Sequence, residues 1–234
     1  QASIAELDGP LVIIVESSDG KELARYETTT PETSKVSPPA TEPPMPAEVT
    51  TADELFVIGQ HLDQYRHATR DAASYWQEAL RRDPGDVRCN NAMGLYRFRR
   101  GEFATARDHF QAAIDRATSR NPNPYDGEPY YNLGLALRFL GQDKEAFDAL
   151  AKSVWNAAWQ APGYHALGEL ACKKGDWPLA LDYLNRALRK DADNFRAADL
   201  KAAVLRKLGK DNEAEAVIKE VLQHDPLDFW ARLL

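Results

Sequence analysis

The sequence predicts an all-α protein in which about five helix pairs stack into a superhelix, with a short β-hairpin and a proline-rich linker in front of them. Four glycines, each at the end of a helical pattern, are 40, 34 and 34 residues apart, and an alanine follows each glycine five positions later. A period near 34 residues is typical of stacked helix pairs and not of a single globular core. The glycines and their alanines are Gly101 with Ala106, Gly141 with Ala146, Gly175 with Ala180, and Gly209 with Ala214.

Residues 1–28 contain the pattern of a β-hairpin between positions 9 and 28. An apolar run, LVIIV, is followed by a turn at SSDG and by the segment KELARYE. Asp19 and Gly20 supply the positive φ that tight hairpin turns need. Because an isolated two-stranded hairpin is only marginally stable in water, it must pack on the helices or belong to a larger sheet. We expect the second, with the other strands of the sheet upstream of Gln1.

Residues 29–52 are predicted to form a linker. Six prolines lie between Pro31 and Pro46 among Thr, Ser and Glu residues, and aromatic residues are absent. This composition favours an extended, polyproline-like chain. The segment from Thr50 to Glu54 then offers N-capping side chains and early acidic residues for a first helix.

Residues 53–234 are predicted to form the helical array. Counting back from each turn glycine gives repeats at about 53–86, 87–120, 127–160, 161–194 and 195–228. A small residue at position 8 of each first helix and another at position 20 of each second helix let the two axes approach closely. Glycine at position 15 ends the first helix in the left-handed conformation. Six extra residues around NPNPYD separate the second and third repeats, and Pro122, Pro124 and Pro129 are expected to make this insert a stiff loop.

This pattern resembles the tetratricopeptide repeat over about three quarters of the chain, which implies a right-handed superhelix. A second resemblance is carried by the strings LDQYRHATRDAASYWQEALRRDPGDVRCNNAMG and RNPNPYDGEPYYNLGLAL. They are similar to a bacterial family of unassigned function, in which a β-sandwich domain like that of galactose mutarotase precedes tetratricopeptide repeats. The hairpin would then be the end of that sandwich and the linker its connector. The resemblance implies a carbohydrate only through the parent protein.

Charge and composition exclude several classes of function. Residues 1–52 carry 9 acidic and 3 basic residues, and residues 53–234 carry 27 and 26. The array therefore lacks the excess of Lys and Arg that binding to nucleic acid requires. The apolar stretch from Leu11 to Val15 is too short to span a bilayer, so no membrane partner is expected. The two cysteines, Cys89 and Cys172, are expected to be reduced packing residues of a cytoplasmic chain.

No residue pattern predicts catalysis, a metal or a cofactor in this chain. None of the five histidines is three or four positions from a second His or Cys, the spacing that would place two metal ligands on one helix face. Neither a phosphate-binding glycine loop nor a G-x-S-x-G motif occurs. We therefore predict that the chain itself is not an enzyme and leave the activity of a longer parent protein open.

The resemblance to tetratricopeptide repeats also implies that the first helices line a concave groove, at positions 2, 5, 9, 12 and 13 of each repeat. A mixture of aromatic, arginine and amide side chains suits recognition of a peptide or protein segment, with Tyr and Arg as the expected anchors. The predicted binding residues are Arg88, Asn91, Phe98, Tyr131, Arg138, His165, Glu169 and Arg196. The same positions also include Leu95, Arg99, Glu128, Leu135, Phe139, Cys172, Lys173, Asp199, Arg206 and Lys207.

The sequence thus predicts an interaction scaffold that presents a groove to a peptide or protein segment, and it leaves two alternatives open. Part of the groove could pack against the parent's own β-domain. The chain could also be the helical half of a carbohydrate-active or sugar-binding protein whose chemistry lies in an upstream β-domain. A sugar could stack on the aromatic residues of the third and fourth repeats, but we expect these rings to pack between repeats, because second-helix positions face the next repeat. They are Trp155, Trp159, Tyr164 and Trp177.

Overall fold

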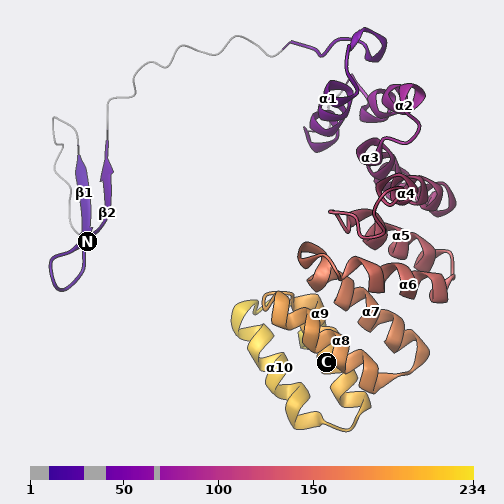
Figure 1. Ribbon diagram of the computed structural model, residues 1–234. Helices are drawn as coiled ribbons and strands as arrows, with labels where there is room; N and C mark the ends of the chain where they lie inside the picture. The colour runs from indigo at the N-terminus through magenta and orange to yellow at the C-terminus, as the bar shows by residue number, and fades with distance from the viewer. Residues whose placement is uncertain (1–10, 29–40, 66–68) are drawn as a thin grey trace. The chain divides into compact units, whose positions relative to one another are not determined.

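The computed structural model describes residues 11–28, 41–65 and 69–234 (Figure 1). It divides into two compact units, residues 1–43 and residues 44–234. Residues 29–40, which make up half of the predicted linker, lie outside the described residues. The helices of the described part are shorter or more polar than a membrane-spanning helix would have to be.

The first unit contains the hairpin. Strand β1 (Val12–Glu16) pairs antiparallel with β2 (Glu22–Glu27), with Ile13 opposite Tyr26. Gly20 has a φ of 80°, so the turn uses the positive φ that its Asp-Gly pair predicts. Every residue of both strands is exposed, so the apolar side chains of β1 face solvent on both sides of the sheet.

The second unit is a stack of helix pairs, each followed in space by the next (Figure 1). The first helices of the pairs are α1 (Ala52–Tyr65), α3 (Val87–Phe98), α5 (Glu128–Phe139), α7 (Gln160–Lys174) and α9 (Phe195–Lys207). Their partners are α2 (Ala72–Arg82), α4 (Phe103–Ala117), α6 (Asp143–Ser153), α8 (Trp177–Lys190) and α10 (Asp211–His224). A short helix, α11 (Phe229–Leu233), follows the last pair, and two 3-10 turns lie at η1 (Pro46–Glu48) and η2 (Ala157–Trp159).

Glycines act at two different places in the α3–α4, α5–α6 and α7–α8 pairs. The four periodic glycines have φ between 72° and 76°, and a side chain there would meet no neighbour within 4 Å. Their role is therefore to turn the chain between the two helices. Gly94, inside α3, is different, because a Cβ atom there would overlap the ring of Phe110 on α4. The small residue at position 8 thus lets the two helices approach, as the sequence predicts.

The end of the predicted linker packs on the first helix pair. Residues 44–50 belong to the helical unit, and Val49 is buried. The Tyr75 hydroxyl on α2 donates to the carbonyl of Pro44 at 2.8 Å. Arg82, at the end of α2, donates to the carbonyl of Val49 at 2.8 Å and to that of Thr50 at 3.1 Å. This segment is therefore part of the N-terminal end of the stack.

The insert between α4 and α5 is tied to the turn after α6. The Asn156 amide donates to the carbonyl of Tyr125 at 2.6 Å, and the Trp159 indole donates to Asp126 at 3.1 Å. Pro129 was expected to stiffen this loop, but it lies outside the loop, buried in the first turn of α5. Proline is tolerated there because the first N–H groups of a helix have no partner within it.

Candidate functional site

One column of side chains runs along the first helices of the array. Asn91 on α3, Tyr131 on α5, His165 on α7 and Asp199 on α9 occupy the same position in successive repeats. The first three are half-buried and Asp199 is buried. Contacts join α3 to α5 and α7 to α9, and the Arg138–Glu169 ion pair joins α5 to α7, so we take this column as the floor of the candidate groove. The surrounding residues divide it into an N-terminal cleft, a central cluster and a C-terminal end.

The N-terminal cleft has a volume of about 330 Å³ and lies over α1, α3 and α5. Arg88 and Asn91, two of the predicted binding residues, line it. So do three further residues from the positions implied by the repeat pattern, Leu95, Arg99 and Glu128. The remaining lining residues are Phe56, Gln60, Asp63, Gln64, Trp76, Val87, Ala92, Asp126 and Pro129.

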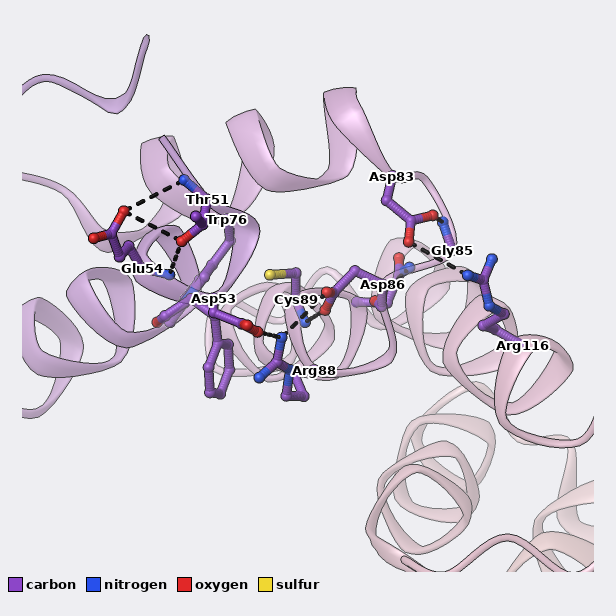
Figure 2. Close-up of polar contacts among 12 residues, drawn as sticks. Thr51, Asp53, Glu54, Trp76, Asp83, Gly85, Asp86, Arg88, Cys89 and Arg116 are labelled. Atoms are coloured by element: carbon purple, nitrogen blue, oxygen red, sulfur yellow. Dashed lines mark hydrogen bonds and ion pairs between the residues drawn. The ribbon is translucent and has the colours of Figure 1, made fainter. Parts of the chain in front are cut away.

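Acidic residues hold Arg88 at one side of this cleft (Figure 2). Its guanidinium forms an ion pair with Asp53 from α1 and lies 3.6 Å from Asp86, whose carboxylate caps α3 by accepting from the amide of Cys89 at 2.8 Å. It also lies 5.0 Å from the ring centre of Phe56. The hydrogen bond that Arg88 donates to the Asp53 carboxylate raises the pKa of Arg88 above its ordinary value. The cation is thus fixed in position while half of its surface stays open to solvent.

Two further contacts join neighbouring first helices within the cleft. Arg99 on α3 donates to both carboxylate oxygens of Asp63 on α1, at 2.8 and 2.9 Å. Asn132 on α5 donates to the side-chain carbonyl of Asn91 at 3.0 Å. The amide N–H₂ of Asn91 has no acceptor among the described residues, so it is available to a carbonyl group of a bound chain.

The central cluster brings together the remaining predicted residues of α5 and α7. Arg138 on α5 forms an ion pair with Glu169 on α7. Tyr131 stacks on Trp159, with ring centres 5.0 Å apart. Burial raises the pKa of the Tyr131 hydroxyl, and the Glu169 carboxylate acts in the same direction. The phenol is therefore a neutral group that can donate or accept a hydrogen bond.

His165 lies within the same electrostatic environment and connects it to α9. Burial is the largest cause of its lowered pKa, and the charges of Arg138 and Arg196 lower it further, whereas Glu169 raises it. The imidazole is therefore neutral near pH 7. Arg196, the predicted residue of α9, is exposed and completes the set of cations along the groove.

Phe98 is placed differently from the other predicted residues. It packs edge-on against Phe103 at 5.2 Å and against Phe139 at 5.4 Å, near the turn that joins α3 and α4. Phe103 and Phe139 stack on each other at 4.6 Å. Phe139 remains 55% exposed, so this aromatic cluster forms an apolar edge next to the groove.

Sequence reasoning missed the contributions of α1, the insert and the turn after α6. Phe56, Asp63 and Asp126 line the cleft, and Trp159 packs on Tyr131. The expectation that the tryptophans pack between repeats is wrong for Trp155, which is 73% exposed. Helix α6 ends at Ser153, so Trp155 lies in the turn beyond it and does not face the next repeat.

The described residues contain no group of three or more His, Cys, Asp or Glu side chains that could hold a metal ion. Both cysteines are free, and Cys89 is buried. Burial raises the pKa of the Cys89 thiol to about 12, which keeps it protonated and unreactive near pH 7. The groove presents amide, arginine and aromatic side chains.

Comparisons with known proteins agree with this architecture. Residues 87–154 and residues 165–229 each match a family model described as tetratricopeptide repeat. Solved structures of similar fold include PilF of Pseudomonas aeruginosa, which is 16% identical with a TM-score of 0.66 over 78% of this chain and 80% of that chain. YrrB, described as a TPR protein with an unusual peptide-binding site, is 18% identical with a TM-score of 0.61, and the match covers 77% of this chain and 90% of YrrB. MamA of Desulfovibrio magneticus is 20% identical with a TM-score of 0.61, and the match covers 74% of this chain and 93% of that chain. At these identities the likeness shows the fold alone.

Proposed function

We propose that this chain, which belongs to the tetratricopeptide repeat family, is an interaction scaffold whose first helices bind an extended segment of a protein partner. The observation that carries the proposal is the open cleft over α1, α3 and α5. Asn91, which lines it, begins a column of equivalent positions that leads to Tyr131 and His165 of the central cluster. A groove of this kind suits a partner in extended conformation, because successive helices present side chains at regular intervals along it.

The side chains of the groove offer the interactions that such a segment needs. The free N–H₂ of Asn91 suits a main-chain carbonyl, and Arg88 suits a carboxylate. Tyr131 offers a large flat surface with a hydroxyl at its end. Tyr and Arg are also the residues that most often dominate the energy of protein interfaces.

The groove is also held in shape before any partner binds. Ion pairs fix Arg88 to Asp53 and Arg138 to Glu169, and a stack fixes Tyr131 to Trp159. Side chains that are already ordered lose less entropy on binding, which favours affinity. The peptide-binding site named for YrrB belongs to that protein, and it adds plausibility to a peptide partner here.

The test is a selection of peptides from a phage-displayed random library on the purified chain. We expect enriched peptides that bind the unaltered protein and lose at least about tenfold in affinity for Tyr131→Ala combined with Arg138→Ala, because hot-spot residues contribute at this level. Arg186→Ala is the matched control, since Arg186 lies on α8 and pairs with Asp182 there. Circular dichroism checks that each variant keeps its helicity. Equal binding of the double variant and the control would contradict the proposal.

A second candidate partner is a β-domain that extends the hairpin. In β1 the apolar residues Val12, Ile13, Ile14 and Val15 are all exposed, whereas a strand with apolar residues on both faces is typical of a sheet covered on both sides. If such a sheet forms, the amides of β1 and β2 will exchange slowly with solvent in the natural protein. Fast exchange of the β1 and β2 amides would contradict a β-domain that extends the hairpin.

A further inference from the structure

The C-terminal end of the groove contains a carboxylate that is buried without a partner. Asp199 occupies the same position on α9 as Asn91, Tyr131 and His165 on their helices, yet it is only 7% exposed. Its Oδ1 atom is buried and accepts no hydrogen bond from any described residue. A carboxylate in this situation is costly for the folded state unless a positive group or hydrogen-bond donor pairs with it.

A second carboxylate lies close to the first. Ala198, next to Asp199, packs against Ala231 of α11, and Asp228 caps that helix by accepting from the Ala231 amide at 2.8 Å. Burial raises the pKa of Asp199 to about 6, and the charge of Asp228 raises it as well. Because the charge of Asp228 has the same sign, it increases the cost of ionising Asp199.

No basic residue of the described structure pairs with these carboxylates. Arg232 on α11 donates to the carbonyl of Pro226 at 2.8 Å, and Arg196 on α9 is exposed. Within the described ranges, neither Asp199 nor Asp228 takes part in an ion pair. The two carboxylates therefore lack the cation that would balance them.

We propose that Asp199 and Asp228 form an anionic subsite at the α9–α11 end of the groove, which takes a lysine or arginine side chain of the bound segment. This inference rests on the proposed function, because the subsite lies on the same face as the cleft. A side chain fits better than a metal ion, since calcium and magnesium need six or more oxygen ligands and two carboxylates do not supply them. A guanidinium can bridge two carboxylates with its parallel N–H donors.

The first arm of the test uses a small probe and does not depend on any peptide. Aspartate carboxyl carbons of the whole chain are labelled with ¹³C, and Nα-acetyl-arginine methylamide is titrated in. We expect the signals of Asp199 and Asp228 to shift and the pKa of Asp199 to fall, because a bound cation favours the charged form. The citrulline analogue, which has nearly the same shape without the charge, serves as the control.

Two comparisons decide this arm. Asp199→Asn should weaken binding of the arginine probe about tenfold or more, as expected for loss of a charge-assisted hydrogen bond. Asp211→Asn, an exposed change on α10, should leave it unchanged. The proposal is overturned if arginine and citrulline probes perturb Asp199 equally, or if the signal of Asp211 responds as strongly.

The second arm separates this inference from the proposed function. Peptides selected from the random library on the unaltered protein should share one lysine or arginine, and selection on Asp199→Asn should lose that preference while peptides still bind. Peptides without a basic preference, or with one that Asp199→Asn preserves, overturn the subsite and leave the groove in place. If no peptide is selected, the groove proposal fails and the arginine titration still decides the subsite.

Discussion

Arg138 on α5 and Glu169 on α7 form an ion pair across two successive first helices. The pair lies next to Tyr131 and His165, whose pKa values both respond to its charges. It therefore links α5 to α7 and contributes to the electrostatic environment of the central cluster.

The two charges of this pair act on His165 in opposite directions. Glu169 raises the pKa of His165 and Arg138 lowers it. We therefore expect Glu169→Gln to lower this pKa further and Arg138→Gln to raise it. A pH titration of the His165 ring signals by NMR measures both shifts. The ring signals of His224, on α10, should follow the same curve in all three proteins. Shifts of the same sign in the two variants would show that the pair does not act on His165.

The two kinds of glycine should respond differently to alanine. Gly101→Ala should cost about 1–2 kcal/mol, because its φ of 76° is unfavourable for a residue with a Cβ. Gly94→Ala should cost at least about 1–3 kcal/mol, because the added methyl group meets the ring of Phe110 in a packed interior. Urea denaturation measures both free energies of unfolding.

A control separates backbone strain from crowding. Gly101→Asn should be tolerated better than Gly101→Ala, since asparagine adopts the left-handed conformation more readily. Gly94→Asn should be at least as damaging as Gly94→Ala. If Gly94→Ala had the same free energy of unfolding as the unaltered protein, stability would not depend on the close approach of α3 and α4.

The helix pairs could be predicted because their signal is local and repeated. Each turn needs one residue with positive φ, and the glycines at 101, 141, 175 and 209 provide it. The same spacing numbers the positions of each first helix, and two of the residues chosen by these numbers, Arg88 and Asn91, line one cleft. Two others, Arg138 and Glu169, lie on successive first helices and contact each other, although 31 residues separate them in the sequence.

The rest depends on contacts that the repeat pattern does not encode. The first pair has its glycine, Gly59, out of register, so the groove residues of α1 could not be numbered. Asp126 comes from an insert that has no counterpart in the other repeats. Trp155 was assigned to a helix that ends two residues earlier, at Ser153. An interruption of the period therefore removes the basis for placing a side chain.

Arg82 should be a main anchor of the segment before α1. Arg82 donates to the carbonyls of Val49 and Thr50 and pairs with Glu78 at 2.8 Å. Arg82→Ala should therefore cost about 1.5–3 kcal/mol, the range for hydrogen bonds to a charged group, and loosen the segment so that a glutamate-specific protease cleaves faster at Glu48. Arg81→Ala is the matched control, because Arg81 pairs with Glu78 at 2.8 Å and is much more exposed. Equal protection of Glu48 in both variants would show that Arg82 does not anchor the segment.

The buried carboxyl of Asp199 should make stability depend on pH. Its pKa is about 6 in the folded protein against 3.8 as the ordinary value. Between about pH 4 and pH 6 the folded state keeps a proton that the unfolded chain has lost, so the free energy of unfolding falls as the pH rises.

Asp199→Asn removes this dependence because asparagine does not titrate. The variant should match the unaltered protein below about pH 4 and exceed its stability above about pH 6, by at most about 3 kcal/mol. Urea denaturation across this pH range measures the difference, and Asp211→Asn should show none. Parallel curves for Asp199→Asn and the unaltered protein would mean that Asp199 is ionised at no cost, through solvent or a partner group that pairs with it. A saturating arginine probe should reduce the difference above pH 6, since it stabilises the charged form that burial disfavours.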